Sequence, residues 1–156
     1  MAVVGPGEAS GDELATAEEV GRSLGEHGAV LVCGGLGGVM EAACRGAKSS
    51  GGTTVGILPG LDRADANPYV DVALPTGLGE ARNALVVRAA DVLIAIAGGY
   101  GTLSEIALAL KRGTPVVGMG TWELARGGVP ERPLVEARGP REAVERALEL
   151  AGPGPR

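Results

Sequence analysis

One stretch decides the fold of this chain: Val92-Leu93-Ile94-Ala95-Ile96-Ala97-Gly98-Gly99-Tyr100-Gly101-Thr102-Leu103-Ser104-Glu105. An apolar run passes through glycines directly into a helix-like segment, Ile106–Leu110. A strand that turns into a helix in this way leaves backbone N–H groups free at the helix start, where the helix dipole is positive. The stretch therefore predicts an anion site, most often for phosphate, whose glycines let a ligand approach the backbone closely.

The residues of this stretch have two predicted roles. Glu105 is a candidate catalytic carboxylate, and the phosphate or nucleotide is expected to contact Gly98, Gly99, Tyr100, Gly101 and Thr102. A simpler interpretation of Thr102-Leu103-Ser104-Glu105 is a capping box, in which Thr102 caps a helix that begins there. The two interpretations are compatible, but a helix cap alone does not require the glycines that precede it.

Apolar runs and helical patterns alternate along the rest of the chain. Strands are predicted at 2–4, 29–33, 53–57, 69–74, 92–96 and 115–119, and helices at 10–28, 39–49, 78–90, 102–112 and near the C-terminus. Strands that are apolar on both faces and alternate with helices predict an α/β protein, a three-layer Rossmann-like fold with a mostly parallel twisted sheet. We expect a single nucleotide- or phosphate-binding domain over residues 1–151 and a disordered tail at 152–156.

A second glycine-rich loop, Gly34–Gly38, also follows an apolar run and opens a helix. Because ligands of such folds bind at the carboxyl ends of strands, both loops are expected to face one pocket. The predicted binding residues of this second loop are Gly34, Gly35, Gly37, Gly38 and Met40. Neither loop completes the G-x-G-x-x-G fingerprint and no P-loop pattern occurs, which argues against dinucleotide binding.

A polar segment, Gly79-Glu80-Ala81-Arg82-Asn83, lies near the start of a predicted helix. It is either a solvated turn or a part of the site. In the second case Arg82 is a candidate catalytic residue whose planar guanidinium clamps a phosphate or carboxylate, and Asn83 is a candidate binding residue.

The composition excludes several classes of function. The chain has 156 residues and a net charge of −5 without a basic run, so nucleic-acid binding is not expected. No apolar run approaches the ~20 residues of a membrane span, and no signal peptide is visible, so we expect a cytoplasmic protein without a membrane partner. One histidine and two cysteines without ligand spacing provide neither a Ser-His-Asp triad nor a metal site, and no cofactor is expected.

Five segments occur in an order typical of a known superfamily: 34–41 (GGLGGVME), 56–59 (GILP), 67–69 (NPY), 81–83 (ARN) and 98–105 (GGYGTLSE). Together they resemble the Lonely Guy (LOG) superfamily, often labelled "possible lysine decarboxylase". The resemblance is strongest to a branch of short bacterial proteins that are also similar to molybdenum cofactor carrier proteins. It spans roughly residues 1–120.

The resemblance implies a Rossmann-like fold that is usually dimeric, and enzymes that cleave the N-glycosidic bond of a nucleoside 5′-monophosphate. Their signature pairs an Arg-Lys dipeptide with G-G-x-G-T-x-x-E. The second element is complete here, but Asn83 stands where the lysine is expected, next to Arg82. The decarboxylase label is rejected, because Lys48 and Lys111, the only lysines, are both far from the glycine loops and unsuited to hold pyridoxal phosphate.

Three functions remain open from the sequence. The first is a phosphoribohydrolase that releases a base and ribose 5-phosphate, with Glu105 stabilising the oxocarbenium charge or activating water, and Arg82 orienting the substrate. The second is a non-enzymatic carrier of a phosphorylated ligand such as the pterin molybdenum cofactor. The third is a nucleotide-sensing or structural dimer. In each case we expect a homo-oligomer, a dimer or a tetramer of dimers, whose partner is a small phosphorylated ligand of nucleotide or pterin type.

Overall fold

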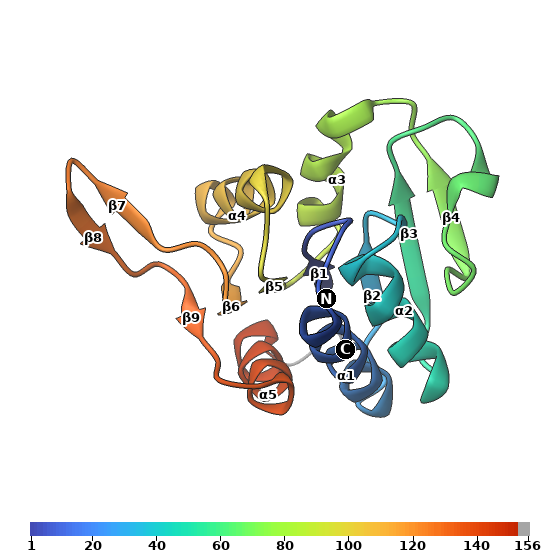
Figure 1. The fold of residues 1–156 in the computed structure, drawn as a ribbon, viewed down its shortest axis with the longest axis horizontal. Helices are drawn as coiled ribbons and strands as arrows, with labels where there is room; N and C mark the ends of the chain where they lie inside the picture. The colour runs from blue at the N-terminus through green and yellow to red at the C-terminus, as the bar shows by residue number, and fades with distance from the viewer. Residues whose placement is uncertain (153–156) are drawn as a thin grey trace.

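A computed structural model of the chain describes residues 1–152 and shows a parallel sheet flanked by helices (Figure 1). The sheet has seven strands in the order β4-β3-β2-β1-β5-β6-β9, and all of its strand pairs are parallel. The strands are β1 (Ala2–Val4), β2 (Leu31–Cys33), β3 (Thr54–Leu58), β4 (Val72–Pro75), β5 (Leu93–Ile96), β6 (Val116–Met119) and β9 (Val135–Glu136). The expected Rossmann-like α/β fold is confirmed. The tail expected at 152–156 lies, after Gly152, outside the described residues.

Helices cover both faces of the sheet. One face packs against α1 (Gly11–Glu26), α2 (Val39–Ser49) and α5 (Pro140–Ala151), and the other against α3 (Asn83–Arg88) and α4 (Tyr100–Arg112). Alternate residues of β5 divide between the two cores: Ile94 joins the first and Leu93 the second, and both are fully buried. This burial on both sides is why the strand sequences are continuous apolar runs rather than alternating ones.

Helix α1 begins as the sequence predicts and lies directly against α2. Ser10 caps it and Glu13 completes the capping box. Two glycines bring the helix backbones together: a Cβ on Gly21 would lie 1.9 Å from the carbonyl oxygen of Ala43, and one on Gly46 would lie 1.9 Å from that of Glu18. Side chains larger than hydrogen do not fit at these two positions.

Gly46→Ala is expected to lower the free energy of unfolding by about 1–3 kcal/mol, as overpacking does. Helix propensity alone would change the free energy of unfolding in the opposite direction, because it favours alanine over glycine by about 1 kcal/mol. Urea unfolding measures the effect, with Gly11→Ala as the control, because a Cβ on Gly11 meets no atom within 4 Å. A Gly46→Ala protein as stable as the wild type would contradict the close helix contact.

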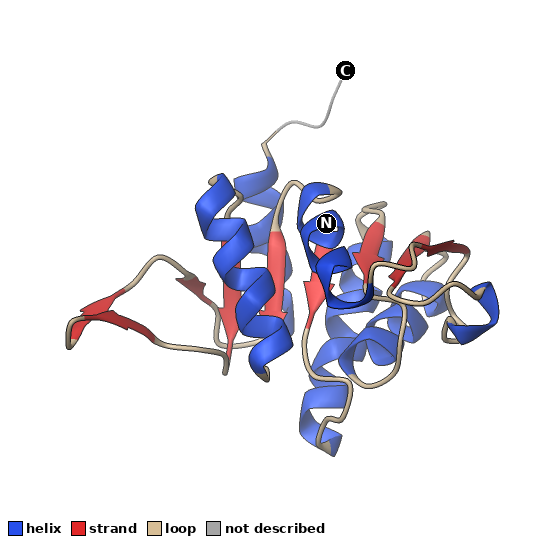
Figure 2. Ribbon diagram, turned by 90° about the horizontal axis from the view of Figure 1, so that it is seen from above, coloured by secondary structure: helices blue, strands red, loops and turns tan. Residues whose placement is uncertain are grey.

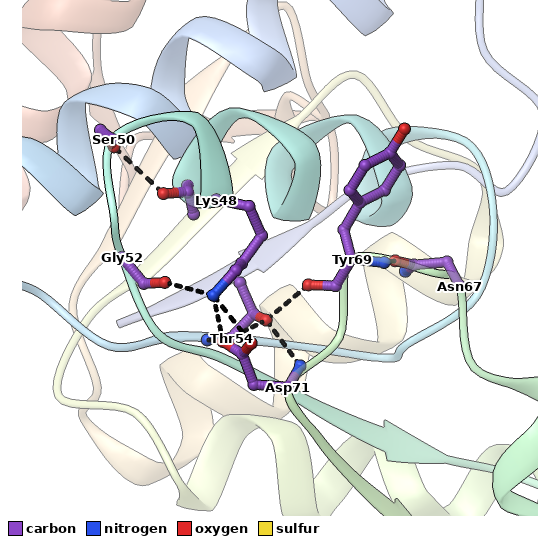
Figure 3. A network of polar contacts seen from close by, with 8 residues as sticks. Lys48, Ser50, Gly52, Thr54, Asn67, Tyr69 and Asp71 are labelled. Carbon is purple, nitrogen blue, oxygen red and sulfur yellow. Dashed lines mark hydrogen bonds and ion pairs between the residues drawn. The ribbon is translucent and has the colours of Figure 1, made fainter.

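Strand β4 begins at Val72, three residues later than the sequence predicts, because side chains bond the segment before it (Figure 3). The Thr54 hydroxyl donates to the carbonyl oxygen of Tyr69 over 2.6 Å. The Asp71 carboxylate accepts from the Thr54 N–H and from Lys48 Nζ, both over 2.9 Å. The Lys48 ammonium lowers the pKa of Asp71. This network ties the end of α2 to β3 and delays the start of β4.

The predicted helix at 78–90 is divided into a 3₁₀ turn, Gly79–Arg82, and the short helix α3. The Gly/Pro-rich segment after β6 also contains structure that the sequence did not predict. It forms a hairpin of β7 (Leu124–Arg126) and β8 (Val129–Glu131), which projects from the body (Figures 1 and 2), and then β9, the seventh strand of the sheet. None of the helices within residues 1–152 is long and apolar enough to cross a membrane.

Candidate functional site

The candidate site lies where the strand order reverses. From β1 the chain adds β2, β3 and β4 on one side, and then β5, β6 and β9 on the other. The carboxyl ends of β2 and β5 lead into the two glycine loops, and that of β1 leads into a third, Gly5-Pro6-Gly7. The three loops meet around a pocket of about 640 Å³, at the position where open α/β sheets bind ligands.

The start of helix α4 presents unused donors to this pocket. Gly99 is the N-cap and provides no side-chain cap, and Leu103 is the first residue whose N–H bonds back into the helix start. Within residues 1–152, the N–H groups of Tyr100, Gly101 and Thr102 have no acceptor. All three residues line the pocket. This set of N–H groups, here called the cradle, is suited to an anion.

The interpretation of Thr102 and Glu105 as a capping box is wrong. Helix α4 begins at Tyr100, two residues before the predicted start, so Thr102 already lies inside the first turn. Glu105 is consequently in the second turn, and no hydrogen bond within residues 1–152 joins its carboxylate to the backbone at the helix start. The carboxylate lines the pocket instead.

Gly99 and Gly101 are not required by the backbone or by packing. Gly99 has φ −92°, Gly101 is helical, and a Cβ on either would meet no atom of the described residues within 4 Å. The space beside both is therefore open, and both residues line the pocket. Gly98 differs, because its φ of 136° is suited to glycine and a Cβ would lie 2.7 Å from the Thr102 Cβ.

Ala97, between β5 and the cradle, has a left-handed backbone with φ 49°. Two contacts from the β6 side hold it there: its N–H donates to the Met119 carbonyl over 3.0 Å, and its carbonyl accepts from the Thr121 hydroxyl. Such a conformation costs about 1 kcal/mol or more in a residue with a Cβ, and it persists because the surroundings impose it. The direction in which the cradle points is thus set by β6.

Glu105 and Arg82 form a buried pair at the pocket wall. The Arg82 Nη1 lies 3.9 Å from the Glu105 Oε1, and the two side chains are about nine-tenths buried. Burial raises the pKa of Glu105 to about 7, although the nearby guanidinium opposes this shift. Glu105 can therefore hold or release a proton near neutral pH.

Arg82 is held from two sides but remains incompletely bonded. Its Nη2 donates to the Gly34 carbonyl over 3.4 Å, and its Nη1 donates to Asn83 Oδ1. The Asn83 amide in turn donates to Ser104 Oγ over 2.9 Å, and Ser104 donates to the Gly101 carbonyl. Among the described residues, Arg82 Nε is buried without a hydrogen-bond partner. An unpaired buried donor is unfavourable, so the hydrogen bonds within the protein do not fully satisfy this guanidinium.

The structure brings most of the predicted site residues to one pocket. Those that line it are Gly34, Met40, Arg82, Asn83, Gly99, Tyr100, Gly101, Thr102 and Glu105. Four others, Gly35, Gly37, Gly38 and Gly98, are not in its lining. Gly35 and Gly38 have positive φ angles of 76° and 63°, and a Cβ on Gly38 would lie 2.3 Å from the Pro6 carbonyl oxygen. These two glycines shape the loop.

Several pocket residues were missed by the sequence analysis. They are Val3, Val4, Gly5, Pro6, Gly7, Leu36, Pro59, Gly79, Glu80 and Ser104. The signal for Gly5–Gly7 was available, since it follows an apolar run just as the other two glycine loops do. Ser104 lies within the decisive stretch, but its contact with Asn83 depends on how α3 and α4 pack.

Comparison with known proteins identifies a matching family and several relatives of this chain. The model of the SLOG cluster4 family matches residues 1–144. An uncharacterized protein of Archaeoglobus fulgidus is 46% identical over 76% of this chain and 78% of its own length. A probable cytokinin riboside 5′-monophosphate phosphoribohydrolase of Oryza sativa subsp. japonica is 35% identical, over 65% of this chain but only 42% of the rice protein.

Two solved structures resemble the whole chain. The molybdenum cofactor binding protein of Rippkaea orientalis has a TM-score of 0.86 at 36% identity, and the match covers 96% of this chain and 94% of that protein. The molybdenum cofactor carrier protein of Chlamydomonas reinhardtii has a TM-score of 0.83 at 33% identity, covering 97% of each chain.

Proposed function

We propose that this chain, which belongs to the SLOG cluster4 family, binds a small phosphorylated ligand of the molybdenum cofactor type and carries it without transforming it. One observation carries the proposal: within residues 1–152, Tyr100, Gly101 and Thr102, whose N–H groups are unpaired, and the cationic Arg82 line the same pocket. A phosphate group would accept hydrogen bonds from these N–H groups and be attracted by the Arg82 guanidinium. The two solved relatives that bind or carry the molybdenum cofactor match nearly the full chain, which supports cargo of this kind.

In this proposal the cradle and Arg82 hold the phosphate, and Thr102 adds a hydroxyl. The glycines at 99 and 101 leave room for the phosphate to approach the backbone. Glu105 lies beside Arg82, and its raised pKa leaves much of it uncharged near pH 7, which limits repulsion of an anionic ligand. Gly34 and Met40, which lie next to the Arg82 side chain, also line the pocket.

Asn83 favours a carrier over a hydrolase. Both ends of its amide are used within the protein, since Oδ1 accepts from Arg82 and Nδ2 donates to Ser104. A lysine at this position, as the LOG signature has it, would add a second cation next to Arg82. The side chain present instead orients Arg82 and contributes no charge to a leaving group.

The second candidate is a nucleoside 5′-monophosphate phosphoribohydrolase, and the Glu105–Arg82 pair is the observation that favours it. A carboxyl group with a pKa near 7 can accept a proton from water as the water attacks the anomeric carbon and the base departs. The rice relative supports this chemistry, but the match spans less than half of that protein. Release of ribose 5-phosphate decides between the two functions.

We also propose that the chain acts as a homo-oligomer. Val72 and Leu74 of the edge strand β4 are 46% and 45% exposed, on the sheet face that α3 and α4 cover elsewhere. Leu85 of α3 is exposed as well. Faces of parallel sheets are normally buried, so a second copy of the chain fits this uncovered part.

Arg82→Gln is expected to lower the amount of bound ligand by about ten- to a hundredfold, the range for loss of charge-assisted hydrogen bonds. The test is purification from a host that makes the molybdenum cofactor, followed by oxidation and fluorescence detection of released pterin. Arg45→Gln is the control, since Arg45 pairs with Glu18 outside the pocket. Wild-type protein without pterin would contradict the carrier function. Catalytic release of ribose 5-phosphate from AMP or GMP, lost in Glu105→Ala, would establish the hydrolase instead.

A further inference from the structure

Aromatic residues are scarce in this chain, and two of them lie together beside the pocket, which Tyr100 lines and Trp122 does not. The chain has one tryptophan, two tyrosines and no phenylalanine. The rings of Tyr100 and Trp122 have centroids 5.7 Å apart and planes inclined by 36°. Tyr100 is 82% exposed, yet it lines the pocket. The buried clusters of the sheet faces are aliphatic. Trp122 packs against the edge of one of them, whereas Tyr100 belongs to neither.

Trp122 supports Tyr100 and is attached to the cradle. Its indole Nε1 donates to the carbonyl of Gly99 over 3.2 Å, and Gly99 is the N-cap of α4. Trp122 comes from the segment after β6, so the same side of the sheet that holds Ala97 also holds the aromatic pair. The Tyr100 ring is therefore backed on one side by protein.

The cradle and the ring share one residue. The backbone N–H of Tyr100 is an unpaired donor at the start of α4, and the side chain of the same residue lies at the pocket mouth. A phosphate held by this N–H places whatever is attached to it near the ring. A planar heterocycle one linker away from a phosphate is a chemical match for this arrangement, since aromatic side chains stack on such rings with little dependence on their identity.

We propose that Tyr100, backed by Trp122, is the stacking platform for the planar nitrogen heterocycle of the phosphorylated ligand. The inference rests on the proposed phosphate binding and extends it: the ligand must carry a flat ring within reach of its phosphate. Purine nucleotides and phosphorylated pterins both have this chemistry. Trp122 is a positioning residue that acts through Tyr100.

The test compares heterocyclic phosphates with ribose 5-phosphate, which has the phosphate but no flat ring. Titration calorimetry is performed with AMP, neopterin monophosphate and ribose 5-phosphate on the wild type, Tyr100→Ala and Tyr100→Phe. Tyr100→Ala is expected to lower the affinity for the two heterocyclic ligands about tenfold or more. The affinity for ribose 5-phosphate is expected to stay within about twofold of the wild-type value. Tyr100→Phe keeps the ring and is expected to keep wild-type affinity. Comparing the affinities for AMP and neopterin monophosphate shows whether the site prefers a purine or a pterin ring.

The single tryptophan provides a second readout. Stacking on Tyr100 is expected to change the emission of Trp122 when AMP or the pterin binds, whereas ribose 5-phosphate leaves it unchanged. If Tyr100→Ala lowers the affinity for all three ligands equally, or for none of them, Tyr100 is not a stacking platform. Either result leaves the proposed phosphate site unaffected. If the wild type binds none of the three compounds, the proposed function fails and the platform with it.

Discussion

Gly101→Val is expected to abolish ligand binding while leaving the stability of the fold close to that of the wild type. Gly101 lies in the first turn of α4, and a Cβ there would meet no atom of the described chain within 4 Å. Its backbone is helical, and valine has a helix propensity at least as favourable as that of glycine. The free energy of unfolding should therefore change by no more than about 0.5 kcal/mol. The added methyl groups would occupy the space in which a phosphate approaches the cradle.

We expect the affinity for ribose 5-phosphate and the amount of retained pterin to fall more than about a hundredfold, because the displaced phosphate loses several hydrogen bonds at once. Calorimetric titration and urea unfolding measure the two properties separately. Gly11→Val is the matched control: it is also in the first turn of a helix, has no atom within 4 Å of its Cβ, and lies outside the pocket. Retained binding in Gly101→Val would show that the ligand does not contact this backbone.

Glu105→Gln is expected to stabilise the protein at pH 8 and to remove part of its pH dependence. The pKa of Glu105 is about 7 in the folded chain, compared with 4.5 for an unperturbed glutamate. Between these values the folded state retains a proton that the unfolded state has released. The free energy of unfolding of the wild type therefore falls as pH rises from about 4.5 to 7, by about 3 kcal/mol in total. Glutamine does not ionise and avoids this loss.

Urea unfolding at pH 5 and pH 8 tests this expectation. The wild type should lose more stability between the two pH values than Glu105→Gln does, and the two proteins should be closest at pH 5. Glu26→Gln is the control, because Glu26 is an exposed carboxylate at the end of α1. Parallel pH profiles for the wild type and Glu105→Gln would show that Glu105 ionises as freely in the folded chain as in water.

The sequence predicted the fold because its signals are local. The runs that became β5 and β6 are apolar throughout, as strands buried on both faces must be, and helix α4 between them carries the expected periodicity. Glycines that end one strand and open a helix predicted the cradle at Tyr100–Thr102 for the same reason. A strand, a tight turn and a helix start involve only neighbouring residues.

The features that sequence reasoning missed depend on contacts between distant segments. The start of α4 was predicted two residues too late, because contacts from Met119 and Thr121 set the turn at Ala97. The apolar run before Gly5–Gly7 marked it as a third glycine loop, but its position at the pocket also depends on the central place of β1 in the strand order. Strand β9 is two residues long and forms only because it pairs with β6.

The left-handed turn at Ala97 has a consequence for how a ligand is received. Because strand β6 and the residues after it fix that turn, the N–H groups of the cradle point in their final directions before any ligand arrives. Such preorganisation means that little conformational entropy is lost on association. Under the proposed function, a scarce phosphorylated molecule would bind without a prior rearrangement of the cradle, and the contacts in the pocket would set the lifetime of the complex.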